Sequence, residues 1–506
     1  MNEYSLLFCE ENSAGIKISE TTLQDLNIDQ IIRAIQDGDP FYRVEAMYRR
    51  FPKTKREEQY RREIFQALKG DSAWDALNRF SEDMKQVHQA AEKEEDVSNE
   101  VQKKAWHLNG AFHYCRAVDS LWELLSSEAA VGAEGLKKFK QYVEEYQQSE
   151  DYIAMCDKVG ELADVFYRSP IVLSIQNNKM YVDWDTTKKR YDRELQSYFS
   201  EEKRQCRSPF IGTVQMSELE LEIISILEKK SPESFQKLEA FYQDCRDFPD
   251  RTIVRLEEEL QYYRLFLKFM RDMEKQGFSF ATPLVREETA MSARGLYDLA
   301  LASQNRHFKN KIIENDFYYG TDELFFVING PNQGGKTTFA RSMGQLVYFA
   351  KMGFDVPAKT ANVHFYQTLL THFSAEESLL TGKGKLKEEL ERMEPLMKQT
   401  EEPAFVILNE LFTTAANYDA RIMGQRVLDF FMGRGCRGVY VTHLEDLEQV
   451  SEKIIPMKAG MAEDEHRRTY KIERGKIASF GYARDIVEKH RLTYGQLKEL
   501  LKGGRQ

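Results

Sequence analysis

The sequence predicts a multidomain α+β protein, in which a long helical region with a small β insert precedes an α/β domain. Three observations support this. None of the 12 prolines lies between Pro52 and Pro170, and that span is rich in good helix formers, which favours long helices. Two strand-like runs then follow the helical region. After about residue 291, short apolar strands alternate with helices, as in parallel α/β sheets.

The elements are expected in the following order. Apolar residues recur at three- and four-residue steps from about Lys55 to Leu125, and again from Gly135 to Tyr167, which predicts helices. The runs 171–176 and 179–184 are strand-like, and the two Asn residues between them tolerate positive φ, so we expect a tight hairpin. Helical periodicity returns from about Ser217 to Gly277. Residues 324–328, 404–408 and 438–442 are candidate buried strands.

Composition excludes several classes of protein. The 506 residues carry 71 Lys and Arg against 82 Asp and Glu, and the resulting charge of −11 argues against bulk coating of nucleic acid or anionic membrane. No apolar run approaches the roughly 18–20 residues that span a bilayer, and the N-terminus lacks a basic signal region. The 6 cysteines are scattered without a CxxC pair, so reduced thiols are expected. We therefore expect a cytoplasmic protein without a membrane partner.

One motif carries specific chemistry. Residues 330–337 match the phosphate-loop pattern GxxxxGK[ST], directly after a buried strand and at the start of a helix. Loop glycines let backbone N–H groups converge on a phosphate, Lys336 would neutralise the β- and γ-phosphates, and Thr337 would ligate Mg²⁺. The expected cofactors are ATP and Mg²⁺. The candidate nucleotide-binding residues are Gly330, Pro331, Asn332, Gln333, Gly334, Gly335, Lys336, Thr337 and Thr338.

Two further strands end in candidate catalytic residues. Strand 404–408 is followed by Asn409 and Glu410, where such ATPases carry Asp-Glu. Glu410 suits the polarisation of an attacking water. Asn409 has no charge to oppose a metal, but its oxygen can accept a hydrogen bond from a Mg²⁺-bound water, so weakened metal affinity is expected. His443 follows strand 438–442 and can contact the γ-phosphate or the water. The alternatives are a plain strand end and a capping histidine.

These residues resemble one family. The run GPNQGGKTT at 330–338 resembles the GPNMGGKST loop of the MutS family of DNA mismatch-repair ATPases. Residues 353–358 resemble its G-x-x-V-P-A, Asn409 to Asp419 its D-E-x-x-x-G-T-x-x-x-D-G region, and 441–443 its A-T-H. The likeness covers most of 290–500. It implies an ABC-type P-loop ATPase domain, a homodimer, DNA as partner, and helical levers that carry a small β clamp.

The chain departs from that family in two places. The family's signature loop S-G-R-S-T-F acts in trans on the other subunit's γ-phosphate, and here its position holds Thr381, Gly382, Lys383 and Gly384. Gly384 replaces a serine hydroxyl, and Glu388 and Glu389 then open a helix expected to be a solvated face. The family's mismatch wedge is a Phe-x-Glu in a separate N-terminal domain. The triplets at Phe8 and Phe80 have the right letters but are expected to be coincidences.

The resemblance implies a domain layout. Residues 1–54 would be the N-terminal segment of the core, and 55–290 the helical core and lever with a clamp-like insert at about 168–215. The ATPase domain would span 291–478. Residues 479–506 resemble the family's terminal helix-turn-helix, which serves dimer contact.

The leading expectation is a MutS-like, dimeric, ATP-dependent DNA-binding protein of the repair and recombination class, which clamps DNA without reading mismatches. The DNA contacts would come from Lys188, Lys189, Arg190, Lys203, Arg204 and Arg207, although interspersed glutamates also fit a solvated surface. An alternative is a nucleotide-gated protein-interaction switch with weak or no hydrolysis. An ATPase of the ABC/SMC kind is a third reading, which the undivided segment 290–506 disfavours.

Overall fold

The computed structural model describes residues 5–9, 15–167, 171–177, 179–184, 216–286, 290–305, 312–374, 385–398, 400, 403–461 and 468–476. It is a mixed α/β protein with two compact units. The first, here the helical unit, comprises Met1–Glu11 and Glu63–Arg264; the second, the α/β unit, comprises Asn12–Arg62 and Leu265–Gln506. Within the described ranges, no helix has an apolar stretch that could cross a membrane.

The helical unit is built from helices and one β-hairpin. Its elements are α5 (Asp71–Asp96), α6 (Glu100–Leu125), α7 (Glu128–Gly132), α8 (Glu134–Gln147), α9 (Glu150–Phe166), β3 (Ile171–Gln176), β4 (Lys179–Trp184), α11 (Glu218–Lys230) and α12 (Pro232–Asp244). Helices α4 (Lys55–Leu68) and α13 (Arg251–Lys275) contribute residues to both units. The helices expected from the apolar spacing are confirmed.

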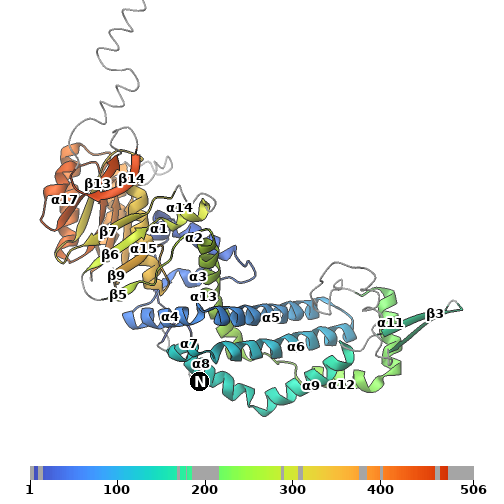
Figure 1. Ribbon diagram of the computed structural model, residues 1–506. Coiled ribbons are helices and arrows are strands. Elements are labelled where there is room, and N and C mark those ends of the chain that lie inside the picture. Colours follow the sequence, from blue (N-terminus) through green and yellow to red (C-terminus); the bar gives the residue numbers. More distant parts are fainter. Residues whose placement is uncertain are drawn as a thin grey trace, which may run out of the picture. The chain divides into compact units, whose positions relative to one another are not determined.

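The pair α5 and α6 is the main packing element of the helical unit, and the two helices lie side by side (Figure 1). Apolar residues of α5 at three- and four-residue steps, including Leu77, Phe80 and Met84, are buried. Phe80 is completely buried in the core, so it cannot act as a surface wedge. Asn99 caps α6 by accepting a hydrogen bond from the Gln102 N–H at 3.0 Å, which fixes where the helix begins.

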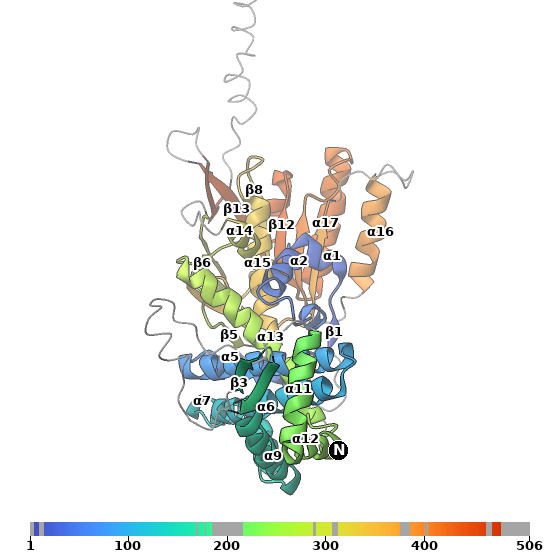
Figure 2. The ribbon, with the colours of Figure 1, turned by 90° about the vertical axis from the view of Figure 1, so that its right-hand side faces the viewer.

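The predicted hairpin is confirmed. Strands β3 and β4 pair antiparallel with Gln176 opposite Lys179, and Asn177 has φ of 49°. Helix α11 lies beside this hairpin (Figure 2). The Trp184 indole N–H donates to the Ser231 hydroxyl at 2.9 Å, and the Lys230 ammonium pairs with Asp183 at 2.8 Å. These contacts attach the hairpin to the end of α11.

The α/β unit has helices on both sides of a mainly parallel sheet. Its strands are β1 (Ile16–Lys17), β2 (Arg50–Phe51), β5 (Leu284–Arg286), β6 (Met291–Leu296), β7 (Asn315–Tyr319), β8 (Phe325–Asn329), β9 (Thr360–His364), β10 (Leu369–Phe373), β11 (Phe405–Asn409), β12 (Arg437–Val441), β13 (Ile454–Met461) and β14 (Arg468–Arg474). Its helices are α1 (Glu20–Asp25), α2 (Ile28–Gln36), α3 (Glu45–Tyr48), α14 (Leu299–Gln304), α15 (Lys336–Met352), α16 (Lys385–Lys398), α17 (Asn417–Gly433) and the 3₁₀ helix η2 (Glu445–Gln449).

The main sheet has the order β10-β11-β12-β8-β13-β14, parallel except at β14. Strands β8, β11 and β12 are the three expected buried strands, each within one residue of its predicted bounds. Helix α15 covers one face of this sheet and α17 the other (Figure 1). A second sheet, β5-β9-β6-β7, packs against α15 through β6. Because β11, β12 and β8 are parallel neighbours, their carboxyl ends meet at one edge.

Residues 12–62 group with the α/β unit. The reason is tertiary packing onto α15. Leu26 lies so close to Gly344 that a Cβ there would stand 2.5 Å from Leu26 Cδ2. The Tyr48 ring stacks on Phe354 at 5.9 Å, and the Tyr348 hydroxyl donates to the Tyr48 carbonyl at 2.5 Å.

Candidate nucleotide-binding site

The loop between β8 and α15 has the backbone that a phosphate loop requires. Gly330, Gln333 and Gly335 have φ of 138°, 59° and 90°. A Cβ at Gly330 would lie 2.8 Å from the Ala459 Cβ, so both the conformation and the neighbouring strand require glycine there. The loop therefore passes from β8 into α15 with its turn formed close to β13.

Lys336 lies at the base of this loop. It is 4% exposed, and its ammonium donates to the carbonyl oxygens of Gly330 at 2.7 Å and Pro331 at 3.1 Å. Burial lowers the pKa of Lys336; the Glu410 carboxylate opposes this effect and Arg468 adds to it. The positive charge of Lys336 thus lies inside the phosphate loop that the sequence motif predicted.

Thr337 and Asn409 are brought together across α15 and β11. The Thr337 hydroxyl donates to Asn409 Oδ1 at 3.0 Å, and Asn409 is 8% exposed at the end of its strand. The side-chain oxygen of Asn409 therefore faces the first turn of α15. No cluster of three or more His, Cys, Asp or Glu that could hold a metal occurs within the described ranges.

Glu410 and His443 also meet at this edge. Glu410 has φ of 54°, and its backbone N–H donates to the Val441 carbonyl at 2.8 Å, which joins the ends of β11 and β12. His443 Nε2 lies 3.2 Å from Glu410 Oε1. The two side chains are 45% and 34% exposed, respectively. They form a hydrogen-bonded pair that solvent can reach.

Two contacts at the site had no signal in the sequence. Asn329, at the end of β8, is 1% exposed and donates from Nδ2 to Glu448 Oε1 of η2 at 2.6 Å. Burial raises the pKa of Glu448, while the bond from Asn329 opposes that shift. The second contact is made by β14: Arg468 Nη1 donates to Gln333 Oε1 at 2.9 Å. Residues far along the chain thus hold both ends of the loop.

Glu389 corrects a sequence expectation. The charged start of α16 was interpreted as a solvated face, but Glu389 is 2% exposed. Its Oε2 accepts a hydrogen bond from the Phe412 backbone N–H at 3.0 Å, and the Ser374 hydroxyl donates to Oε1 at 3.5 Å. Phe412 has φ of 59°, two residues after Glu410. The carboxylate therefore holds the turn that carries Glu410.

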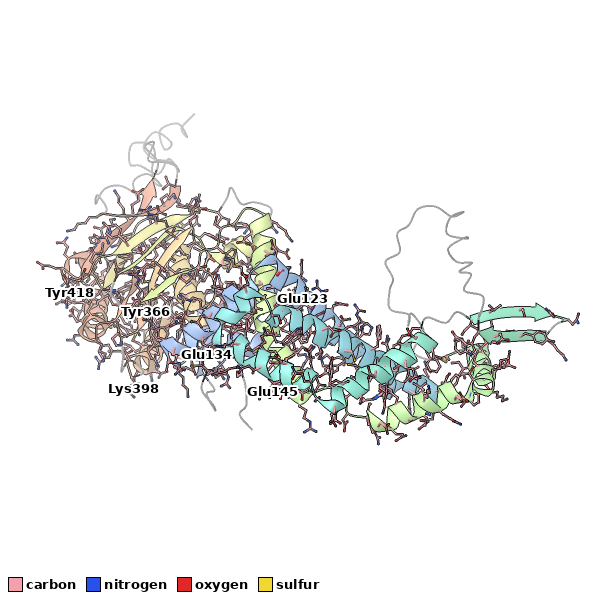
Figure 3. The ribbon with its side chains drawn as sticks, turned by 60° about the horizontal axis from the view of Figure 1, so that its bottom comes forward. Glu123, Glu134, Glu145, Tyr366, Lys398 and Tyr418 are labelled. Carbon is pink, nitrogen blue, oxygen red and sulfur yellow. The ribbon has the colours of Figure 1, made fainter. Side chains whose placement is uncertain are left out.

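The remaining predicted residues divide into two groups. Tyr418 and Asp419 lie in the first turn of α17, and Tyr418 is 66% exposed at the surface (Figure 3). The signature-loop residues 381–384, the basic residues Lys188 to Arg207 and the terminal segment 479–506 lie outside the described residues.

The residues present fit Mg²⁺ and ATP. A glycine loop, a buried Lys336 and the oxygens of Thr337 and Asn409 face one edge of the sheet. Such an arrangement can hold polyphosphate oxygens and a hard cation, which prefers oxygen ligands. The Glu410–His443 pair stands at the same edge and can accept or donate a proton.

Comparison with known proteins shows which proteins this site resembles. Residues 326–484 match the family model for MutS domain V. The chain is 25% identical over 211 residues to the DNA mismatch repair protein MutS of Thermotoga sp. (strain RQ2). This alignment covers 40% of the chain and 26% of the relative. It is 24% identical over 274 residues to the same-named protein of Thermotoga petrophila, covering 54% of the chain and 33% of the relative.

A third relative, the MutS of Lactobacillus delbrueckii subsp. bulgaricus, is 23% identical over 237 residues, or 46% of the chain and 27% of the relative. The chain therefore aligns with about a quarter to a third of the length of these relatives. The matched family segment contains the phosphate loop, Asn409, Glu410 and His443. Through residues 326–484, which carry this site, the chain is similar to proteins of the MutS family.

Proposed function

We propose that this protein is a MutS-like, ATP-dependent DNA-binding protein of the repair and recombination class, in which ATP hydrolysis drives a conformational change. The observation that carries the proposal is the meeting of Lys336, the Thr337–Asn409 pair and the Glu410–His443 pair at one edge of a parallel sheet. Phosphate-binding, metal-binding and proton-accepting groups are what hydrolysis of a nucleoside triphosphate requires.

Binding begins with Lys336. Its ammonium donates to two loop carbonyls, and phosphate oxygens would take over these donors because an ionised acceptor forms a stronger hydrogen bond. The cost of burying Lys336, expressed in its lowered pKa, is offset when a phosphate charge arrives. The N-terminus of α15 adds partial positive charge at the same point.

Asn409 sets the strength of metal binding. Mg²⁺ would neutralise charge that develops on the phosphates. Thr337 supplies a hydroxyl oxygen for it, and Asn409 Oδ1, 3.0 Å from that hydroxyl, can accept a hydrogen bond from a metal-bound water. Because an amide carries no negative charge, the metal is held more weakly than by a carboxylate.

Glu410 and His443 serve the attacking water. The Glu410 carboxylate can accept a proton from a water at hydrogen-bond distance. His443 Nε2, 3.2 Å from Glu410 Oε1, orients the carboxylate and can contact the γ-phosphate side of the same water. Both side chains remain partly exposed, so water reaches them without a change in the core.

Single-turnover hydrolysis of radiolabelled ATP by the wild type and by Glu410→Gln tests the proposal. Glutamine keeps the shape and loses the basicity, so the rate should fall about 100-fold or more while ATP still binds. Glu394→Gln, on exposed α16 and paired with Lys398, is the matched control and should hydrolyse at the wild-type rate. Equal rates for wild type and Glu410→Gln would contradict the role of Glu410.

A second candidate function is a nucleotide-gated switch that holds a protein partner and hydrolyses ATP weakly or not at all. The neutral Asn409 next to Thr337 favours it, because weak metal binding slows hydrolysis more than it weakens ATP binding. Tight ATP binding with no turnover in either the wild type or Glu410→Gln would support the switch. Rapid wild-type turnover would exclude it.

DNA is the proposed macromolecular partner, clamped without mismatch reading by a homodimer. Support comes from the similarity to MutS proteins and from the hairpin β3–β4, which directly precedes the basic residues 188–207 in the sequence. On the same proposal, residues 55–290 act as core and lever, 381–384 act in trans, and 479–506 join the subunits. A binding panel of homoduplex, mismatched, branched and single-stranded DNA, with and without ATP, should show affinity that falls with salt. Absent binding at low salt would exclude the clamp.

A further inference from the structure

Two cysteines of the helical unit lie in contact. Cys115 on α6 and Cys156 on α9 have their sulfur atoms 3.2 Å apart, and the two thiols are hydrogen-bonded to each other. Both residues are partly exposed and both are free thiols. A disulfide requires about 2.05 Å between the sulfurs, so bond formation would move them together by about 1 Å in total. Helices α6 and α9 already pack against each other.

The two thiols differ in reactivity. The hydrogen bond with Cys115 lowers the pKa of Cys156, and the Tyr152 hydroxyl, one helical turn away, lowers it further, whereas burial opposes both. The bond to Cys156 and burial raise the pKa of Cys115. Cys156 is therefore the thiol that ionises first and the nucleophile toward an electrophilic oxidant, because the thiolate is the reactive form.

Metal binding explains this pair of thiols less well than oxidation does. No third His, Cys, Asp or Glu completes a metal-binding cluster with it among the described residues. A thiol pair without further ligands, one member of which is activated, instead has the features of an oxidation site with its resolving cysteine. We propose that Cys115 and Cys156 form a reversible disulfide when the protein meets a hydroperoxide.

Oxidation of the two thiols by hydrogen peroxide would take two steps. The Cys156 thiolate attacks one peroxide oxygen, the O–O bond breaks, and Cys156 sulfenic acid forms while hydroxide leaves and takes up a proton. The Cys115 sulfur, after losing its proton, attacks the Cys156 sulfur; the S–S bond forms, and the sulfenic oxygen leaves as water. Two thiols lose two electrons in total, and hydrogen peroxide is reduced to two waters. A dithiol reductant reverses the bond by exchange.

The bridge would restrain one part of the helical unit. Helix α9 ends at Phe166, and β3 of the hairpin begins at Ile171, so a link from α9 to α6 fixes the helix from which the hairpin strand continues. The two cysteines are 41 residues apart, and a cross-link over that loop removes conformational freedom mainly from unfolded and partly unfolded states.

The test uses the full chain, first reduced and then treated with hydrogen peroxide, which is removed with catalase before analysis. Thiol titration in denaturant should show the loss of two of the 6 thiols, and non-reducing peptide mapping should find the 115–156 cross-link. In Cys115→Ser, dimedone should label Cys156 as sulfenic acid, because the resolving thiol is gone. Dithiothreitol should restore all 6 thiols in the wild type.

Cys245→Ser is the matched control, since Cys245 is a partly exposed thiol of the same unit, and it should form the cross-link as the wild type does. Hydrogen exchange of the 150–166 amides should slow on oxidation of the wild type and of Cys245→Ser, but not of Cys156→Ser. Retention of all 6 thiols, or a cross-link at another pair, would overturn the proposal. Unchanged exchange despite the cross-link would overturn the restraint of α9.

Discussion

Buried polar groups serve different ends in the two units. In the helical unit they form pairs between helices: His113 Nδ1 lies 2.8 Å from Asp83 Oδ1, and the buried Glu257 Oε2 lies 2.9 Å from Nε2 of the partly exposed His88. In the α/β unit they gather at strand ends, where Lys336 donates to loop carbonyls and Asn409 accepts from a hydroxyl. Paired groups of the first kind hold helices together. Groups of the second kind can exchange a contact within the chain for a contact with a ligand.

Loss of Lys336 should break this contrast most strongly. Lys336→Ala removes two donors that phosphate oxygens would use, and charged hydrogen bonds of this kind are worth about 1.5–3 kcal/mol each, so ATP affinity should fall about 100-fold or more. Titration of a fluorescent ATP analogue measures it. Lys398→Ala, on the exposed end of α16, should bind normally (Figure 3). ATP affinity retained in a folded Lys336→Ala would show that the phosphates bind elsewhere.

Acid should affect the stability of the two units differently. Burial lowers the pKa of His372 to about 4, with Arg392 adding to the effect. The folded state therefore favours the neutral ring, so stability is complete above the unfolded pKa of about 6.5 and falls as pH drops from there to about 4, by up to about 3 kcal/mol. Hydrogen exchange of β10 amides at several pH values measures this loss, which His372→Gln should reduce.

In the helical unit, the effect of pH on stability through His88 should have the opposite sign. The bond to Glu257 raises the pKa of His88, while burial opposes it. The contribution of His88 is thus present below about pH 6.5 and is lost as pH rises through the raised folded pKa. In His88→Gln, hydrogen exchange of the α5 amides should lose the part of its pH dependence that comes from this pair. Acid destabilisation of α5 that equals that of β10 would remove the contrast.

Glu389 should affect turnover more than binding. Glu389→Ala removes the acceptor for the Phe412 N–H and frees the turn that carries Glu410, so kcat should fall about tenfold, the equivalent of one hydrogen bond to a charged group, with ATP affinity unchanged. Glu389→Gln keeps an oxygen acceptor and should restore most of the rate. Steady-state kinetics and ATP titration separate the two effects. A parallel loss in both would indicate general disruption of the unit.

The smallest effect is expected at Asn409. Asn409→Asp places a carboxylate next to the Thr337 hydroxyl, and its charge should lower the Mg²⁺ concentration for half-maximal hydrolysis by about fivefold. Asn409→Ala, which loses the acceptor, should raise it. Activity measured against Mg²⁺ concentration distinguishes these outcomes. If all three proteins require the same Mg²⁺ concentration, Asn409 does not act on the metal.

Local patterns in the sequence predicted much of the architecture. The absence of proline between Pro52 and Pro170 predicted the helices α5 to α9, and two asparagines predicted the turn at Asn177. The motif predicted a phosphate loop between a strand and a helix, and the positive φ of Gly330 and Gly335 fits it. Each of these features depends on the backbone preferences of residues that are neighbours in the chain. For this reason they can be inferred without knowledge of the fold.

Contacts between distant segments were decided only by the tertiary structure. Nothing local distinguishes Glu389 from the solvated glutamates around it, but α16 places it against the Phe412 N–H. Similarly, 329 and 448 are 119 positions apart, and the packing of η2 against β8 makes Asn329 a partner of Glu448. The sulfurs of Cys115 and Cys156 meet because α6 packs on α9. The sequence alone thus determined the loop that is proposed to bind the nucleotide, and the packing of remote elements decided which side chains support it.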